Sequence, residues 1–121
     1  MQREIKFRAW DAVNKMMDCD VFINGDGSVY DYASPTYNTP NIEIERQYFT
    51  IMQYTGMQDE CGEDIYEGDI IIWEYSKKPQ EVFWDNSICG FSTKYYHLWR
   101  TVKKVKVVGN IYENPELMEV K

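Results

Sequence analysis

QYTGMQDECGEDIYEGDIII, the stretch from Gln53 to Ile72, decides the fold of this chain. Two glycine-marked turns flank the pair Ile65–Tyr66, and Gly68–Asp69 then leads into three consecutive isoleucines. Turn residues that separate short runs of β-branched and aromatic residues are typical of a hairpin. An unbroken apolar run that follows such a turn is consistent with a buried strand. The stretch therefore predicts a hairpin that leads into a buried strand, and it contains no recognisable catalytic motif.

The segments before this stretch also indicate strands. Glu4–Trp10 alternates apolar and polar residues, which predicts a half-buried strand. Asn24–Gly27 supplies the positive φ angles of a tight hairpin turn. Asp31–Asn41 holds two prolines and little aliphatic content, so it is predicted to be the longest loop. Glu43–Tyr54 fits both the alternation of a strand and the spacing of a helix, and the sequence leaves that choice open.

Short strands follow one another after Gly56 at intervals of roughly ten residues, which is the spacing of small barrels and sandwiches. They are expected at residues 70–75, 81–85, 89–96 and 102–108, with Gly109–Asn110 ending the last one. Asn114 before Pro115 predicts one short helical turn. We therefore predict a mainly β chain, with a β-rich α+β arrangement as the alternative. It is expected to form a single domain over residues 1–121, comprising an N-terminal β-hairpin, a small SH3-like barrel or compact twisted sheet, and a short C-terminal helix.

The charge of the chain is acidic overall and uneven along the sequence. The net charge is −7, which opposes binding to nucleic acid through the phosphate backbone. Residues 57–69 carry six acids and no base, whereas residues 100–106 carry four bases and no acid. We interpret them as solvated surfaces that complement each other within or between subunits; an acidic docking surface for a basic partner is the alternative.

The N-terminal residues and the hydropathy argue against export and membrane insertion. MQREIKFRAW is charged and lacks the apolar region of a signal peptide. No apolar run approaches the ~20 residues that span a bilayer. We therefore expect a cytoplasmic protein with no membrane partner.

The cysteines and the one histidine do not predict a metal site or a cofactor. Cys19, Cys61 and Cys89 are widely spaced, and structural zinc normally takes close pairs of Cys or His ligands. We expect free, mostly buried thiols. His97 lies among aromatic residues, so a packed strand histidine is favoured over a partner for a cysteine nucleophile. The turn Asn24–Gly27 lacks the flanking ligands of a calcium loop.

Three kinds of function remain open. The first is binding without catalysis, for which the candidate binding surface comprises Tyr66, Asp69, Trp73 and Trp84. The second is association with nucleic acid, either as an acidic mimic of DNA or by stacking single-stranded bases on an aromatic and basic stretch. The residues of that stretch are Tyr95, Tyr96, Trp99, Arg100, Lys103 and Lys104. The third is a hydrolase that uses the acids between Asp59 and Asp69.

Three segments, in the same order, resemble the YopX family of small proteins encoded by bacteriophages and prophages. They are REIKFRAWD at Arg3–Asp11, QYTGMQDECGEDIYEGDII at Gln53–Ile71 and GNIYENPELM at Gly109–Met118. Cys61 stands where the family more often has a polar residue. The resemblance implies a phage or prophage origin and a bacterial host cell, and it implies no reaction. Together with the sequence it favours a non-enzymatic binding or adaptor protein that self-associates or binds a host or phage protein.

Overall fold

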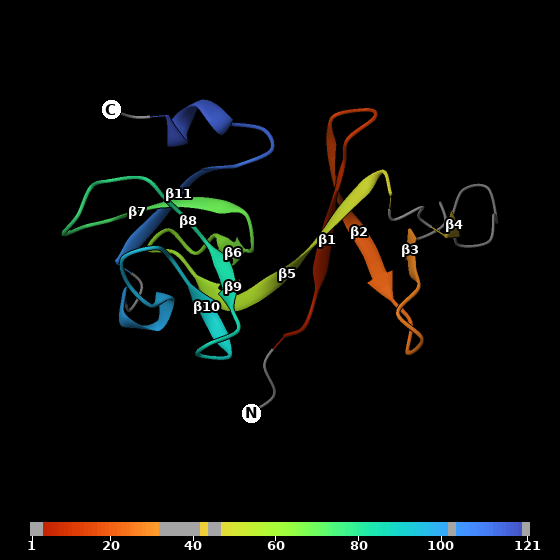
Figure 1. Ribbon diagram of the computed structural model, residues 1–121, viewed down its shortest axis with the longest axis horizontal. Helices are drawn as coiled ribbons and strands as arrows, with labels where there is room; N and C mark the ends of the chain where they lie inside the picture. The colour runs from red at the N-terminus through yellow and green to blue at the C-terminus, as the bar shows by residue number, and fades with distance from the viewer. Residues whose placement is uncertain (1–3, 32–41, 44–46, 102–103, 120–121) are drawn as a thin grey trace. The chain divides into compact units, whose positions relative to one another are not determined.

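The computed structural model describes residues 4–31, 42–43, 47–101 and 104–119 (Figure 1). Among these residues most regular structure is β, and the sheets are antiparallel, which confirms the mainly β prediction. The chain divides into two compact units, one formed by Glu4–Gln53 and the other containing Tyr54–Lys121. Most of the predicted loop Asp31–Asn41, and Lys103 of the aromatic and basic stretch, lie outside the described residues.

The N-terminal unit is built from an antiparallel sheet in the order β4-β3-β2-β1-β5. Its strands are β1 (Phe7–Asp11), β2 (Met16–Ile23), β3 (Val29–Asp31), β4 (Ile42–Glu43) and the first part of β5 (Phe49–Gln58). The Asn24–Gly27 turn joins β2 to β3, which confirms the predicted hairpin. Glu43–Tyr54 is resolved as strand from Phe49 onward. A small core forms where Ala9, Val21 and Val29 pack together.

The C-terminal unit contains the rest of β5 and five further strands. β6 (Asp64–Tyr66) pairs with β5, while β7 (Asp69–Trp73) lies between β11 (Val105–Asn110) and β8 (Gln80–Glu81). β9 (Phe83–Asp85) and β10 (Gly90–Ser92) form a separate pair. Single 3-10 turns follow at η1 (Leu98–Thr101) and η2 (Pro115–Met118). The core comprises Ile65, Ile71, Val82, Leu98 and Val105, all at most 1% exposed.

This arrangement confirms the turns and strands of the Gln53–Ile72 stretch. Gly56, Gly62 and Gly68 have φ angles between +82° and +86°, which other residues adopt only at a cost. The β5–β6 pair and the turn at Gly68 then deliver Ile70 and Ile71 into the core, where neither is exposed. The prediction of a hairpin that leads into a buried strand is therefore correct.

Other sequence-based predictions need correction. No sheet of the described residues closes on itself, so the SH3-like barrel is not confirmed. The expected strand at 81–85 is interrupted at Val82, whose N–H donates to Asp69 O at 2.9 Å while its own O accepts from Gly68 N. β10 covers only three of the residues expected at 89–96, and β11 continues through Gly109–Asn110. The C-terminal helix is present only as the 3-10 turn η2.

The predicted burial of the cysteines is wrong. Cys19, Cys61 and Cys89 are all exposed. Cys61 lies in the turn between β5 and β6 and Cys89 in the turn between β9 and β10, while Cys19 lies on an exposed position of β2. A cysteine in a turn is therefore placed by the turn and not by its affinity for apolar surroundings.

Candidate ligand-binding pocket

The most acidic stretch of the chain forms a backbone scaffold. Asp59 is 2% exposed, and its Oδ1 accepts from the N–H groups of Cys61 and Glu63, both at 2.8 Å. Its Oδ2 accepts from Val107 N at 3.0 Å. Burial alone would raise the pKa of Asp59, but these three N–H groups, helped by Lys106, hold it below its ordinary value. Asp59 therefore stays charged and ties the β5–β6 turn to β11.

The acidic and basic stretches meet inside the C-terminal unit. Glu60 N donates to Val105 O at 2.9 Å, next to the bond between Asp59 and Val107. Glu60 and Lys106 also line one shallow depression beside Trp73. The two stretches therefore meet through backbone bonds, and the charge of Lys106 acts on the Asp59 carboxylate.

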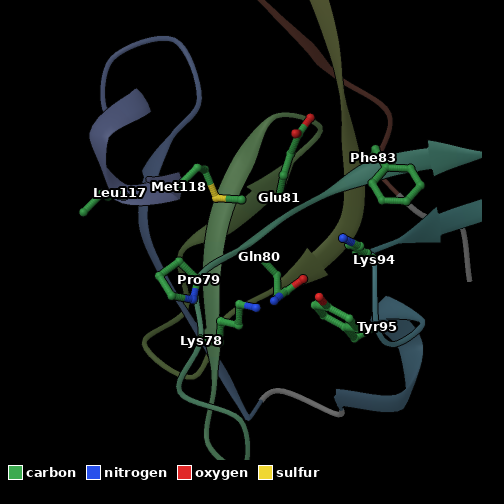
Figure 2. A pocket seen from close by; sticks show the side chains of 9 residues that line it. All are labelled: Lys78, Pro79, Gln80, Glu81, Phe83, Lys94, Tyr95, Leu117 and Met118. Atoms are coloured by element: carbon green, nitrogen blue, oxygen red, sulfur yellow. The ribbon is translucent and has the colours of Figure 1, made fainter. Parts of the chain in front are cut away.

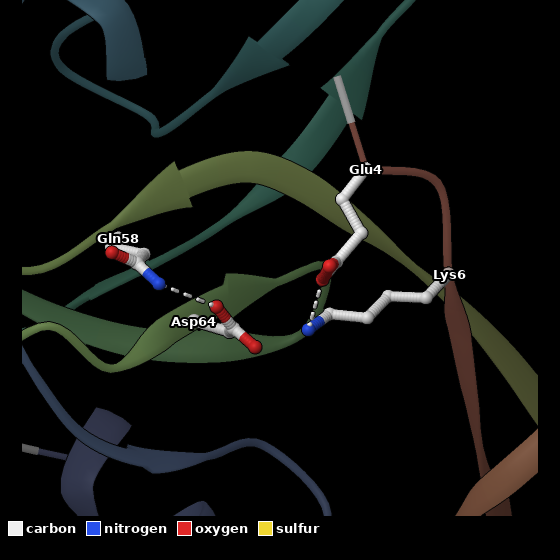
Figure 3. Close-up of polar contacts among 4 residues, drawn as sticks. All are labelled: Glu4, Lys6, Gln58 and Asp64. Atoms are coloured by element: carbon white, nitrogen blue, oxygen red, sulfur yellow. Dashed lines mark hydrogen bonds and ion pairs between the residues drawn. The ribbon is translucent and has the colours of Figure 1, made fainter. Parts of the chain in front are cut away.

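The other acids of this stretch make local contacts. Gln58 Nε2 donates to Asp64 Oδ1 at 3.2 Å (Figure 3). Figure 3 also shows a surface ion pair of the N-terminal unit, in which Lys6 Nζ lies 2.6 Å from Glu4 Oε1. Among the described residues, no group of three His, Cys, Asp or Glu side chains gathers in a way that would hold a metal ion.

The four residues of the candidate binding surface have different environments. Asp69 and Tyr66 are buried, and Asp69 Oδ2 accepts from Tyr66 N at 2.8 Å, which fixes the turn before β7. Trp73 is half-buried, with its ring centroid 4.8 Å from that of Tyr96. Trp84 is 44% exposed and donates from Nε1 to Asn86 Oδ1 at 2.7 Å. Only Tyr66 and Asp69 are joined directly by a hydrogen bond.

The residues of the aromatic and basic stretch lie in different environments and do not form one surface. Tyr96 packs against Trp73, and burial raises the pKa of Tyr96. Trp99, on η1, is 64% exposed and stacks on His97 with 6.1 Å between ring centroids, and Arg100 beside it is exposed. Lys104 Nζ instead donates to Tyr75 Oη at 2.8 Å. Tyr95 lies in a pocket, described below, with residues that the sequence did not indicate.

One serine and the histidine lie close together, but their geometry does not suit nucleophilic catalysis. Ser92 Oγ lies 3.4 Å from His97 Nδ1. The same hydroxyl is 3.0 Å from Thr93 O and 3.2 Å from Tyr96 O, so its proton is directed to backbone carbonyls. Ser92 is also only 3% exposed. A nucleophile needs a hydroxyl that gives its proton to the base and faces the substrate, and Ser92 does neither.

A pocket of about 330 Å³ opens in the C-terminal unit and is lined by lysine, tyrosine and apolar side chains (Figure 2). Its basic part is centred on Tyr95, which is 60% exposed. Lys78 Nζ lies 5.1 Å and Lys94 Nζ 5.4 Å from the centroid of the Tyr95 ring. The two ammonium groups, Lys78 first, lower the pKa of the Tyr95 hydroxyl. Neither lysine forms an ion pair with a described residue.

The remaining walls of the pocket are apolar or buried polar. Pro79 and Phe83 come from the segment around β8 and β9, and Leu117 and Met118 from η2. Gln80 is only 3% exposed, and its amide makes no hydrogen bond to another described residue. Figure 2 shows the ends of Lys78, Gln80 and Tyr95 directed toward one another, with Lys94 beside them.

Glu81 contributes the one acid of the lining. Burial raises the pKa of its carboxyl above the ordinary value. Figure 2 shows that carboxyl pointing away from the two lysines, because neighbouring residues of a strand face opposite ways. The pocket therefore has a basic end, apolar walls and a separate acidic edge.

Sequence reasoning missed most of this site. The sequence indicates Tyr95, but Lys78 and Pro79 fall between the strands expected at 70–75 and 81–85, and Leu117–Met118 follow the predicted helical turn at Pro115. The lining comes from three segments whose contact depends on the break at Val82 and on the path of the chain after β11. No local sequence pattern indicates that these three segments come together.

Comparisons with known proteins agree with the fold. No curated protein gives a significant match. Protein EF1440 from Enterococcus faecalis, known from a crystal structure, is 24% identical, with a TM-score of 0.64 over 97% of this chain and 99% of that one. Protein yopX from Bacillus subtilis is 17% identical, with a TM-score of 0.52 over 92% and 95% of the two chains. Both likenesses concern the fold alone.

Two further findings bear on class. No helix among the described residues has both the length and the apolar composition that crossing a membrane requires. The profile of the YopX protein family matches residues 6–119, which include both compact units. This chain therefore belongs to the YopX family.

Proposed function

We propose that this protein is a phage- or prophage-encoded binding or adaptor protein of the bacterial cytoplasm, without catalytic activity of its own. The source is what membership of the YopX family implies. The observation that carries the proposal is the pocket formed around Tyr95, which combines apolar walls with a few polar groups in the manner of binding sites. The acids of the Asp59–Asp69 stretch support it too, because Asp59 and Asp69 hold backbone N–H groups instead of facing a cleft.

The test is capture of partners from bacteria that carry the parent phage or prophage. The bait is compared with a Met118→Lys variant, which places a bulky charge at the pocket wall, and with Lys77→Gln, a neighbouring change outside the lining. Met118 is 41% exposed, so the variant is expected to fold. A partner retained by the bait and by Lys77→Gln, but lost with Met118→Lys, is the expected result. Identical capture by all three would contradict a function based on this pocket.

Self-association is part of the proposal. Exposed apolar side chains support it better than the acidic and basic stretches do. Because the charged stretches already contact each other within one chain, they leave less to attract a second copy. Exposed apolar side chains on the β9–β10 pair, namely Phe83, Trp84 and Ile88, are the better support. Light scattering at low and high salt is expected to show an oligomer at both. A monomer at both concentrations would remove this part of the proposal.

Association with single-stranded nucleic acid is the second candidate. It is favoured by the exposed ring of Trp99, which is held against His97 with Arg100 next to it. Stacking of a base on such a ring is sequence-tolerant, and binding through basic residues weakens with salt. A fluorescent oligonucleotide titrated at low salt should bind the wild type and lose affinity in Trp99→Ala. No binding at low salt would end this candidate.

A further inference from the structure

The basic end of the pocket holds positive charge that no acid of the described residues neutralises. Lys78 and Lys94 flank one tyrosine ring in a chain whose net charge is −7, and neither forms an ion pair within the described residues. Each ammonium group lies within 5.4 Å of the centroid of the same ring, so an anion bound beside that ring would be attracted by both. The pocket is therefore electrostatically complementary to an anionic group.

The buried side chain of Gln80 gives a second, independent indication. Gln80 is only 3% exposed and lines the pocket. Its side-chain amide makes no hydrogen bond to another described residue. An amide that faces a pocket and has no protein partner is available to bond a ligand there. Figure 2 shows it beside the Tyr95 hydroxyl and the Lys78 amine, so a bound anion there would have donors from an amide, a hydroxyl and two ammonium groups.

The apolar walls restrict the source of that anion. Pro79, Leu117 and Met118 would be left facing water by a free phosphate, which brings no apolar group. An internal Asp or Glu brings a carboxylate but no apolar group on the same residue. The last residue of a peptide brings both from one α-carbon. The volume of about 330 Å³ lies at the small end of ligand pockets, which suits one or two residues.

We propose that this pocket binds the free carboxyl terminus of a peptide whose last side chain is apolar, with the carboxylate at Lys78, Lys94, Gln80 and Tyr95 and the side chain against Pro79, Leu117 and Met118. This inference rests on the proposed binding function and names the chemical class of its partner. Capture of a terminal carboxylate by a small set of donors is an established mode of peptide recognition.

The test uses two dipeptides, N-acetyl-Ala-Leu with a free carboxylate and the same compound as the terminal amide. Each is titrated into the ¹⁵N-labelled full chain, and the Gln80 side-chain amide and the Tyr95 backbone amide are followed by NMR. The acid is expected to shift both signals and to bind at least about tenfold more tightly than the amide, which is the size of effect that about 1.4 kcal/mol produces. Raising the salt concentration should weaken binding of the acid more than binding of the amide.

Variants identify the groups responsible. Lys78→Gln and Lys94→Gln should each weaken binding of the acid, whereas Lys77→Gln, which removes the same charge from an adjacent residue outside the lining, should leave it unchanged. All three lysines are exposed, so the variants are expected to fold, and their spectra report this directly. Equal weakening by Lys77→Gln would show that net charge and not the pocket is responsible, and would overturn the inference.

Other outcomes separate this inference from the function beneath it. Equal binding of acid and amide would overturn carboxylate recognition but leave a peptide-binding pocket in place. A different outcome is that inorganic phosphate competes for the pocket as strongly as the unlabelled dipeptide acid does. That result would show a site for any small anion and would also overturn the inference. If neither dipeptide shifts the two signals, terminal-carboxylate binding is wrong, and the capture experiment with Met118→Lys decides separately whether the pocket binds a partner.

Discussion

Asp59→Asn should destabilise the C-terminal unit at neutral pH and have little effect in acid. The carboxylate accepts three N–H groups at 2.8, 2.8 and 3.0 Å. An asparagine oxygen still accepts from Cys61 and Glu63, but each bond to a charged acceptor becomes a neutral one, a loss of about 1 kcal/mol each. The new NH₂ group faces Val107 N–H, which loses its acceptor at a further cost of about 1 kcal/mol or more. The free energy of unfolding should fall by about 3 kcal/mol, a large part of a typical total.

The pH dependence gives this prediction its sign. Because the folded-state pKa of Asp59 lies below the ordinary carboxyl value of 3.8, its contribution is complete above that value. The contribution is lost as the pH falls through the lowered folded-state pKa. The difference between wild type and Asp59→Asn should therefore be full at pH 7 and shrink steadily at pH values below about 4.

Urea unfolding followed by tryptophan fluorescence provides the assay. Trp73, Trp84 and Trp99 lie in the C-terminal unit and only Trp10 in the other, so the signal reports mainly the unit that contains Asp59. Glu63→Gln, an exposed change in the same turn, serves as the matched control and should alter stability by less than about 0.5 kcal/mol. Equal stability of Asp59→Asn and wild type at pH 7, or a difference that does not change with pH, would refute the reasoning.

Three further predictions concern packing and charge in the same unit. Gly109→Ala should cost about 1–3 kcal/mol by thermal unfolding, because the added Cβ would lie 2.5 Å from Asn114 Oδ1; a second change, Asn114→Ala, should relieve part of that cost, and strictly additive effects would contradict this. Ile65→Ala should cost about 2–5 kcal/mol, since Ile65 is fully buried in the core, and a loss below about 1 kcal/mol would show that the site collapses. Glu81→Gln should stabilise the protein at pH 7 but not below about pH 4, because burial raises the folded-state pKa of Glu81 and penalises its charged form; unchanged stability at pH 7 would contradict that.

Turn chemistry made much of the fold predictable. The Asn24–Gly27 hairpin and the glycines of the Gln53–Ile72 stretch were identifiable because residues that tolerate positive φ mark turns directly in the sequence. Asn110, which was expected at the end of the last strand, holds the turn that follows: its Oδ1 accepts from Tyr112 N at 3.0 Å and Glu113 N at 2.8 Å. These features are local, so a single sequence is enough to read them.

Predictions that depended on long-range pairing were weaker. Val82 sits in an alternating run, yet its backbone bonds to Asp69 and Gly68 break the strand and leave Trp84 exposed on a separate pair. Barrel closure was expected from strand spacing alone, and spacing does not determine which edges pair. The candidate pocket depends on the same break, which explains why only Tyr95 of its lining was anticipated.

The three segments that resemble the YopX family in the sequence and the residues that line the pocket are largely different. Asp59, Asp69 and Asn110 belong to these three segments. The side-chain oxygen of each accepts hydrogen bonds from backbone N–H groups. The lining, by contrast, comes from residues 78–83 and 94–95, which lie outside those segments, and from Leu117 and Met118 at the end of the last one. Because the turns are held by their own side chains, a change in the pocket lining would leave them in place. We therefore expect relatives with this fold to share the turns and to differ in what their pockets bind.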